Sequence, residues 1–114
     1  MGKKKIVIID DEEDLCQLMK AYLEEMDHEV FLANTLGSGL TLMKEVSPDV
    51  LFIDNNLPDG LGWEKMSYLA KHFPDCKINL ISAYQSNPVH IADSTLSIRV
   101  LEKPLSLNSL KEYL

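Results

Sequence analysis

The sequence has few cysteines and no long apolar run. Cys16 and Cys76 are the only two cysteines among 114 residues, and they lie far apart in the chain. No apolar stretch approaches the roughly 18 residues that cross a bilayer, and no secretory signal segment is visible. Disulfides persist mainly outside the reducing cytoplasm. We therefore expect a cytoplasmic protein without membrane contact and without a disulfide between the two cysteines.

Basic residues are also scarce relative to acidic ones. The chain has 11 Lys and Arg against 18 Asp and Glu, which gives a net charge of −7. This charge repels phosphate backbones and anionic membranes, so direct contact with nucleic acid is not expected. A chain of 114 residues with 46% hydrophobic residues is long enough to enclose one core and too short for two. We expect residues 1–114 to form a single domain.

Short apolar runs rich in β-branched residues recur along the chain. Segments with helical periodicity separate them, which is typical of parallel strands joined by crossover helices. The five predicted strands are 5–10, 29–33, 50–54, 78–82 and 98–102. Strands and helices that alternate with right-handed crossovers form an open, doubly wound sheet. The sequence therefore predicts an α/β fold with a five-stranded parallel sheet.

Apolar residues at intervals of three and four predict the helices. The clearest stripe runs from Leu15 to Met26, after three acidic residues that favour a helix start. Further helices are expected at 35–46, at 63–73, at 86–96 where the helix is short or frayed, and from 107 onwards. The second helix carries Gly37 and Gly39, each costing up to about 1 kcal/mol relative to Ala. The last stripe stops at Leu114, which is consistent with an incomplete helix in a domain cut from a longer protein.

Polar residues stand at the ends of the predicted strands, and they are Asp10, Asp11, Asp54, Ser82 and Lys103. A doubly wound sheet binds its ligands outside the carboxyl ends of its strands, so these groups are expected to converge. Three neighbouring carboxylates repel one another unless a cation is present, and Mg²⁺ prefers oxygen ligands. Together with Lys103 they predict phosphoryl chemistry in which Asp54 is the nucleophile. Taken alone, the acidic pair would be read as helix-capping residues.

The motifs at these strand ends resemble those of the receiver domains of two-component response regulators. They are the acidic pair at 10 and 11, DNNLPDGLG at 54–62, the Ser82–Ala83 pair, and KP at 103 and 104. All four occur in this order, and the resemblance runs from residue 4 to the last residue. It implies a flavodoxin-like (βα)5 fold, with a doubly wound parallel sheet in the strand order 2-1-3-4-5.

The resemblance also implies a phosphorylation switch. Asp54 would accept a phosphoryl group from the phosphohistidine of a sensor histidine kinase or phosphotransfer protein. Lys103 would pair with a phosphoryl oxygen, and the Ser82 hydroxyl would move to hydrogen-bond the modified Asp54. The Lys103–Pro104 peptide bond is expected to be cis, as is common in such domains. The domain would catalyse only its own phosphorylation and dephosphorylation, so it would not be an enzyme with a separate substrate.

The cofactor implied by the resemblance is Mg²⁺, which Mn²⁺ could replace. Asp11, Asp54 and the backbone carbonyl of Asn56 would hold it directly. Asp10 would reach the metal mainly through water.

The output of the switch is left open by the sequence. Receivers commonly carry Tyr or Phe at the third residue before the lysine, where this chain has Val100. A signal carried by the rotation of an aromatic ring is therefore in doubt. The partner could be a C-terminal output domain or a downstream protein, and the domain could form a homodimer.

Two other functional classes compete with the receiver: a docking module, and a stand-alone enzyme that would be either a phosphatase or a flavin-binding relative. A pseudo-receiver would act as a docking module without phosphorylation, but the complete set of acids with Ser82 and Lys103 speaks against it. A phosphatase with an aspartate nucleophile would carry an acid at position 56, where Asn56 stands. A flavin-binding relative would need a phosphate-cradling loop after the first strand, where DDEED repels phosphate.

Overall fold

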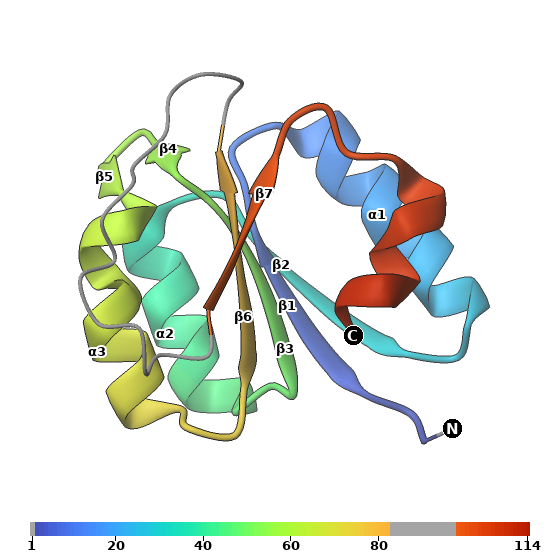
Figure 1. Cartoon of the computed structure of the whole chain (residues 1–114), viewed down its shortest axis with the longest axis horizontal. Coiled ribbons are helices and arrows are strands. Elements are labelled where there is room, and N and C mark those ends of the chain that lie inside the picture. The colour runs from blue at the N-terminus through green and yellow to red at the C-terminus, as the bar shows by residue number, and fades with distance from the viewer. Residues whose placement is uncertain (1, 83–97) are drawn as a thin grey trace.

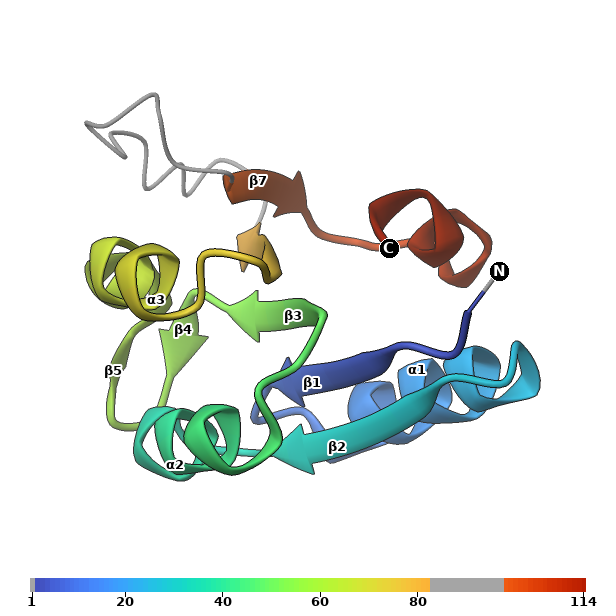
Figure 2. The same ribbon diagram turned by 90° about the horizontal axis from the view of Figure 1, so that it is seen from below.

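The centre of the molecule is a five-stranded parallel sheet in the order β2-β1-β3-β6-β7 (Figures 1 and 2). The computed structural model describes residues 2–82 and 98–114. The five strands are β1 (Lys5–Ile9), β2 (Glu29–Ala33), β3 (Val50–Asp54), β6 (Lys77–Ser82) and β7 (Ile98–Glu102). Every neighbouring pair in this sheet is parallel. The order of these strands, counted along the chain, is 2-1-3-4-5, so the predicted fold class is confirmed.

Helices cover both faces of the sheet (Figures 1 and 2). The helices α2 (Leu36–Val46) and α3 (Met66–His72) lie on one face. The helix α1 (Glu13–Glu25) and the C-terminal 3₁₀ helix η2 (Leu107–Tyr113) lie on the other. The sheet is thus the middle of three layers, as a doubly wound fold requires.

The side chains of the strands fill two apolar cores, one on each face of the sheet. Val7 and Ile9 belong to the core under α2 and α3, whereas Ile6 and Ile8 belong to the core under α1 and η2. This division follows from the two-residue period of a strand. All five residues of β3 are buried. Burial on both faces explains why β3 reads as a continuous apolar run.

The chain after β3 contains short elements that the sequence pattern did not predict. It forms a small antiparallel hairpin of β4 (Asn56–Leu57) and β5 (Gly60–Leu61). The helix expected at 63–73 begins as a 3₁₀ helix, η1 (Gly62–Lys65), and α3 follows without a break. These elements bring the chain around the end of β3.

The C-terminal helix η2 is a 3₁₀ helix. Leu107 and Leu110 are three residues apart, a spacing at which side chains align in a 3₁₀ helix. The predicted start of this helix at residue 107 is therefore confirmed, whereas the apolar spacing did not predict that the helix is of the 3₁₀ type. The helix expected at 86–96 and the position of Ala83 lie outside the described residues.

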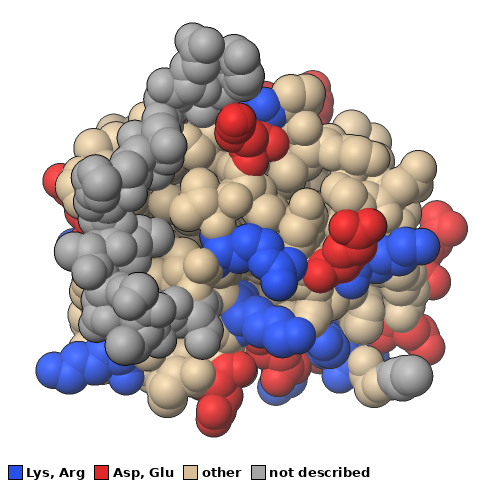
Figure 3. Space-filling model, in the orientation of Figure 1, with Lys and Arg blue, Asp and Glu red and all other residues tan. Residues whose placement is uncertain are grey.

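Side-chain donors fix the carbonyl end of η2 to the sheet. Asn79, which is buried in β6, donates from Nδ2 to the carbonyl oxygen of Tyr113 at 3.3 Å. Lys77 donates from Nζ to the carbonyl oxygen of Leu114 at 2.7 Å. Such donors satisfy the last carbonyls of a helix, which have no partner within it. Figure 3 shows the molecule from the side seen in Figure 1. Lys and Arg side chains gather over the middle of this view, with acidic side chains around them.

Gly39 allows α2 to pack closely against β1. A Cβ atom added to Gly39 would lie 2.8 Å from Cγ1 and 2.9 Å from Cγ2 of Ile9, and nearer still to its Cδ1. The Ile9 side chain is fully buried, so it has no free space into which it could move. The helix-propensity cost of a glycine at this position is therefore offset by close packing between helix and strand.

We predict that Gly39→Ala lowers the free energy of unfolding by about 1–3 kcal/mol, because the added methyl group overpacks the core around Ile9. Urea unfolding followed by circular dichroism measures this change.

Gly37→Ala is the matched control in the same helix. A Cβ atom at Gly37 would lie 3.4 Å from Oδ2 of Asp59, an ordinary van der Waals distance. This variant should be neutral or more stable by up to about 1 kcal/mol, because Ala has the higher helix propensity. Equal effects of the two substitutions would contradict the packing explanation.

Candidate functional site

The polar residues predicted from the sequence lie together at the carboxyl end of the sheet. Asp54 is the last residue of β3, Ser82 is the last residue of β6, and Asp10 and Lys103 follow β1 and β7 directly. Parallel strands in register end at one side of the sheet, and Asp54 pairs with Ile81, the residue before Ser82. Asp10, Asp54 and Ser82 are all buried. The expected convergence of these positions is therefore present.

The backbone of Asp10 is fixed by the last residue of β2 and by Asn34, which follows this strand. The Asp10 amide donates to the carbonyl oxygen of Ala33 at 3.0 Å. Asn34 donates from Nδ2 to the Asp10 carbonyl oxygen at 2.9 Å. These bonds hold the turn between β1 and α1 so that the Asp10 carboxylate lies inside the protein, where its exposed fraction is 0%.

Three carboxylates meet at this end of the sheet. Asp10, Asp11 and Asp54 each offer one oxygen, and these oxygens all lie within 4.8 Å of one another. Asp10 and Asp54 are buried, whereas Asp11 is exposed. Oδ1 of Asp10 accepts a hydrogen bond from the amide of Glu12 at 2.9 Å. Oδ2 of Asp10 is buried and has no hydrogen-bond partner within the described part of the chain.

Burial raises the pKa values of the two buried acids. The pKa of Asp10 rises from 3.8 to about 6, mainly because the carboxyl group is removed from water; the nearby charge of Asp54 adds to the rise. The hydrogen bond from Glu12 opposes it. The pKa of Asp54 is also raised by burial, and the charge of Lys103 partly offsets this effect. Both acids therefore resist ionisation where they stand.

Lys103 supplies positive charge to this site. Its Nζ lies 3.2 Å from Oδ1 of Asp54 and 2.9 Å from Oε1 of Glu12. Burial alone would lower the pKa of Lys103, but the hydrogen bond to Glu12 and the charges of Asp54 and Asp10 outweigh it, so the pKa is raised. The ammonium group is therefore charged at neutral pH.

The backbone around Lys103 joins the ends of two strands. The Lys103 amide donates to the carbonyl oxygen of Ser82 at 2.8 Å, so the ends of β6 and β7 are joined directly beside the acids. The Lys103–Pro104 peptide bond is cis, as the resemblance implied.

The loop after Asp54 is held by Asn55 and Gly62. The Asn55 side chain is buried, and its Oδ1 accepts a hydrogen bond from the amide of Trp63 at 3.0 Å. The amide of Gly62 donates to the Asn55 carbonyl oxygen at 2.7 Å. A Cβ atom at Gly62 would lie only 2.7 Å from the Asp54 carbonyl oxygen, so a glycine is needed there. Asn56 is exposed and begins β4, which places it two residues beyond Asp54.

Asp59 ties the same loop to α2, which the sequence analysis did not predict. Its Oδ1 accepts from the amide of Leu36 at 2.7 Å, and its Oδ2 accepts from the amide of Gly37 at 2.9 Å. The hydrogen bonds from Gly37 and Leu36 lower the pKa of Asp59. A carboxylate is favoured at a helix start because the first amides have no partner within the helix. Asp59 is 23 positions from Leu36 and 22 from Gly37, so no local sequence pattern indicates these hydrogen bonds.

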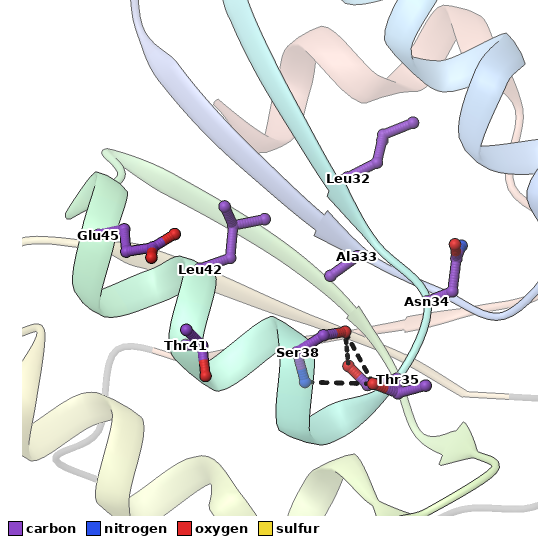
Figure 4. A pocket seen from close by; sticks show the side chains of 8 residues that line it. All are labelled: Leu32, Ala33, Asn34, Thr35, Ser38, Thr41, Leu42 and Glu45. Carbon is purple, nitrogen blue, oxygen red and sulfur yellow. Dashed lines mark hydrogen bonds between the residues drawn. The ribbon is translucent and has the colours of Figure 1, made fainter.

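A groove between β2 and the start of α2 contains none of the predicted site residues (Figure 4). It is lined by Leu32, Ala33, Asn34, Thr35, Ser38, Thr41, Leu42 and Glu45. Thr35 Oγ1 accepts from the Ser38 amide at 3.1 Å and lies 2.7 Å from Ser38 Oγ. These hydroxyl groups cap the start of α2 and bond to one another, so we assign no chemistry to the groove.

The residues at the carboxyl end of the sheet fit a divalent cation. Oδ2 of Asp10 has no partner among the described residues, and a buried carboxylate oxygen of this kind is costly unless a cation or donor meets it. The donor set consists of carboxylate oxygens, which Mg²⁺ prefers over nitrogen or sulfur ligands. Asp10, Asp11 and Asp54 together carry more negative charge than Lys103 alone can balance.

The sequence matches the family described as the response regulator receiver domain over residues 6–114. The chain therefore belongs to the receiver domain family of response regulators, the proteins of two-component signalling.

Curated relatives agree with this assignment. The chain is similar to the response regulator protein PilR of Pseudomonas aeruginosa, with 29% identity over 113 residues, covering 98% of this chain and 25% of PilR. Protein PilH of the same organism is 31% identical over 67 residues, or 59% of this chain and 55% of PilH. The chain thus spans less than two thirds of the length of these relatives.

Solved structures show the same fold. A response regulator receiver domain protein from Clostridium thermocellum superposes with a TM-score of 0.83 at 26% identity, covering 96% of this chain and 89% of that one. A two-component response regulator from Clostridium difficile gives a TM-score of 0.82 at 28% identity, covering 96% and 91%. Within residues 2–82 and 98–114, no helix has the length and apolar character needed to cross a bilayer.

We predict that Asp10→Asn stabilises the metal-free domain at pH 7 by about 1–3 kcal/mol. The pKa of Asp10 is raised from 3.8 to about 6, so ionisation of the folded protein costs stability as the pH rises from about 4 to 6. Asn avoids this cost and can still accept the Glu12 amide. Urea unfolding at pH 4, 5, 6 and 7 with a chelator present measures the difference.

The difference between the two proteins should be small at pH 4, where the carboxyl group is protonated in the folded protein and only about half ionised in the unfolded chain. The exposed Asp75 offers a control, since Asp75→Asn removes the same charge at a solvated position. A difference for Asp10→Asn that is the same at every pH, or that matches Asp75→Asn, would contradict the prediction.

Proposed function

We propose that this domain is a phosphoaccepting receiver in which Asp54 takes a phosphoryl group from the phosphohistidine of a sensor histidine kinase or phosphotransfer protein. The observation that supports this proposal most strongly is the pairing of a buried Asp54 carboxylate with the Lys103 ammonium at 3.2 Å, next to Asp10 and Asp11. A nucleophile, a fixed cation and a set of cation ligands are the parts that phosphoryl transfer needs.

The chemical step is a displacement at phosphorus. One Asp54 carboxylate oxygen forms the new P–O bond while the P–N bond to the imidazole breaks, and its electron pair stays on the imidazole nitrogen. The products are an acyl phosphate on Asp54 and an unphosphorylated histidine side chain that remains part of the donor protein. Lys103 donates to a phosphoryl oxygen, and its fixed charge stabilises the charge on the transferring group.

Asp10, Asp11, Asp54 and the backbone carbonyl of Asn56 would hold Mg²⁺, or Mn²⁺ in its place. When bound, the ion supplies positive charge against the phosphoryl oxygens and against the clustered carboxylates. The role of the chain's own residues is to fix the acceptor oxygen and to keep the site within the protein.

The switch that follows involves the end of β6. In this proposal the Ser82 hydroxyl turns to hydrogen-bond a phosphoryl oxygen, and the backbone bond between Lys103 and Ser82 couples this movement to β7. Val100 of β7 is 45% exposed and has no ring that could turn inward. The output would therefore differ from a switch based on an aromatic rotamer.

The partners beyond the kinase are also proposals. The match covers only 25% of PilR, and an output domain outside residues 1–114 or a separate downstream protein would receive the signal of this domain. A similar structure, with a TM-score of 0.78 and 25% identity, is the beryllofluoride-activated NtrC4 receiver domain dimer. A phosphorylation-dependent homodimer is accordingly one form that the output could take.

We predict that incubation with Mg²⁺ and acetyl phosphate adds the mass of a single phosphoryl group to the wild-type domain. Asp54→Asn should show no increment, because the amide is not a nucleophile for this reaction. Asp75→Ala, which removes an exposed acid far from the site in sequence, should be modified like the wild type. Intact-protein mass spectrometry measures all three.

The outcome separates the competing functions. No increment in the wild type would favour a docking module that is not phosphorylated. Repeated turnover of a phosphoester would favour an enzyme with a separate substrate, because a receiver would release only the phosphate that Asp54 had accepted from its phosphodonor.

A further inference from the structure

Lys103 lies between two carboxylates that differ sharply in exposure. Its Nζ is 2.9 Å from Oε1 of Glu12 and 3.2 Å from Oδ1 of Asp54. The Glu12 side chain is 59% exposed and that of Asp54 only 4%, with Lys103 between them at 25%. The ammonium group is thus shared by the acceptor carboxylate inside the protein and a solvated carboxylate outside it.

The Glu12 side chain does not cap the start of α1. Glu12 is the N-cap residue of this helix, but its side chain makes no capping hydrogen bond. Its amide, not its carboxylate, bonds to Asp10. The carboxylate instead reaches Lys103, which is 91 positions away in the sequence. In the sequence, Glu12 is one of the three acidic residues, Glu12, Glu13 and Asp14, that favour the start of this helix.

We propose that Glu12 is a positioning residue that holds Lys103 in the unphosphorylated domain and gives it up when Asp54 is modified. This inference rests on the proposed function. A phosphoryl group on Asp54 adds charged oxygens inside the site, where water screens them less than it screens Glu12. The Lys103 ammonium group therefore leaves the solvated Glu12 carboxylate and binds the buried phosphoryl oxygens on Asp54. The Glu12 side chain then no longer has an ion pair with Lys103.

The exchange gives Glu12 a measurable role as a competitor. As long as Glu12 binds Lys103, part of the attraction between Lys103 and a phosphoryl group is spent on breaking this ion pair. Removing the Glu12 charge should therefore strengthen the binding of a phosphoryl mimic. The effect should be modest, since ion pairs with an exposed member are weak.

The test uses beryllofluoride, a non-covalent mimic of the phosphoryl group, with Mg²⁺ at a saturating concentration for each protein. Isothermal titration calorimetry gives the dissociation constant for the wild type, Glu12→Gln and Glu13→Gln. We expect Glu12→Gln to bind about two- to fivefold more tightly than the wild type. Glu13→Gln removes the same charge one residue later in the chain and should bind within about 1.5-fold of the wild type.

Lys103→Met provides the second half of a double-mutant cycle. In this background Glu12→Gln should have no effect on beryllofluoride affinity, because the partner that Glu12 competes for is gone. Glu12→Asp is a further variant that keeps the charge but shortens the side chain by one methylene group. It should also bind more tightly than the wild type, which a simple effect of net charge would not produce.

Several results would overturn the inference. Equal affinities of Glu12→Gln and Glu13→Gln, weaker binding by Glu12→Gln, or an undiminished effect in the Lys103→Met background would each do so while leaving the proposed function intact. A wild-type domain that binds no beryllofluoride would overturn both. Melting curves of each variant without ligand verify that the compared proteins are folded.

Discussion

The main constraint on this structure is the burial of like charges at one end of a parallel sheet, because these charges require compensation. Asp10 and Asp54 are 0% and 3% exposed, and Asp11 brings a third carboxylate oxygen within 4.8 Å of theirs. An unpaired buried charge costs several kcal/mol, so such a cluster persists only with compensation. Lys103 and the Glu12 amide compensate in part. The remaining imbalance makes the site receptive to a divalent cation, and it is most evident at Oδ2 of Asp10, which no donor in the described part of the chain meets.

The rest of the fold keeps this cluster in place. The fully buried strand β3 carries Asp54 to its position. Gly62 lets the following loop pass close to Asp54, since a Cβ atom at this position would lie only 2.7 Å from the Asp54 carbonyl oxygen. Asp59 anchors that loop to α2, and Gly39 lets α2 lie close against β1. Asp10 and Asp54 therefore stand on neighbouring strands whose relative position is set by packing on both faces of the sheet.

The sheet and the positions of the acids could be predicted because their signals are local. Apolar runs that end in Asp10 and Asp54 are visible in the sequence, and a parallel sheet brings such ends together. The ion pair of Glu12 and Lys103 and the cap that Asp59 provides could not be predicted. Each joins residues far apart in the chain, and each residue alone has an ordinary local explanation as a helix-start acid or a turn residue. The 3₁₀ helices could not be distinguished from α-helices in the sequence, since their apolar spacing also suits an α-helix.

Thermal unfolding at increasing MgCl₂ concentration, with ionic strength held constant by NaCl, tests most directly whether a divalent cation balances the buried acids. A ligand that binds only the folded state adds stability in proportion to the logarithm of its concentration above Kd, about 2.7 kcal/mol at 100 times Kd. We expect the Tm of the wild type to rise with Mg²⁺ in this way, and the rise to be much smaller for Asp10→Asn. A Tm that does not respond to Mg²⁺, or that rises equally in both proteins, would contradict the role assigned to the cluster.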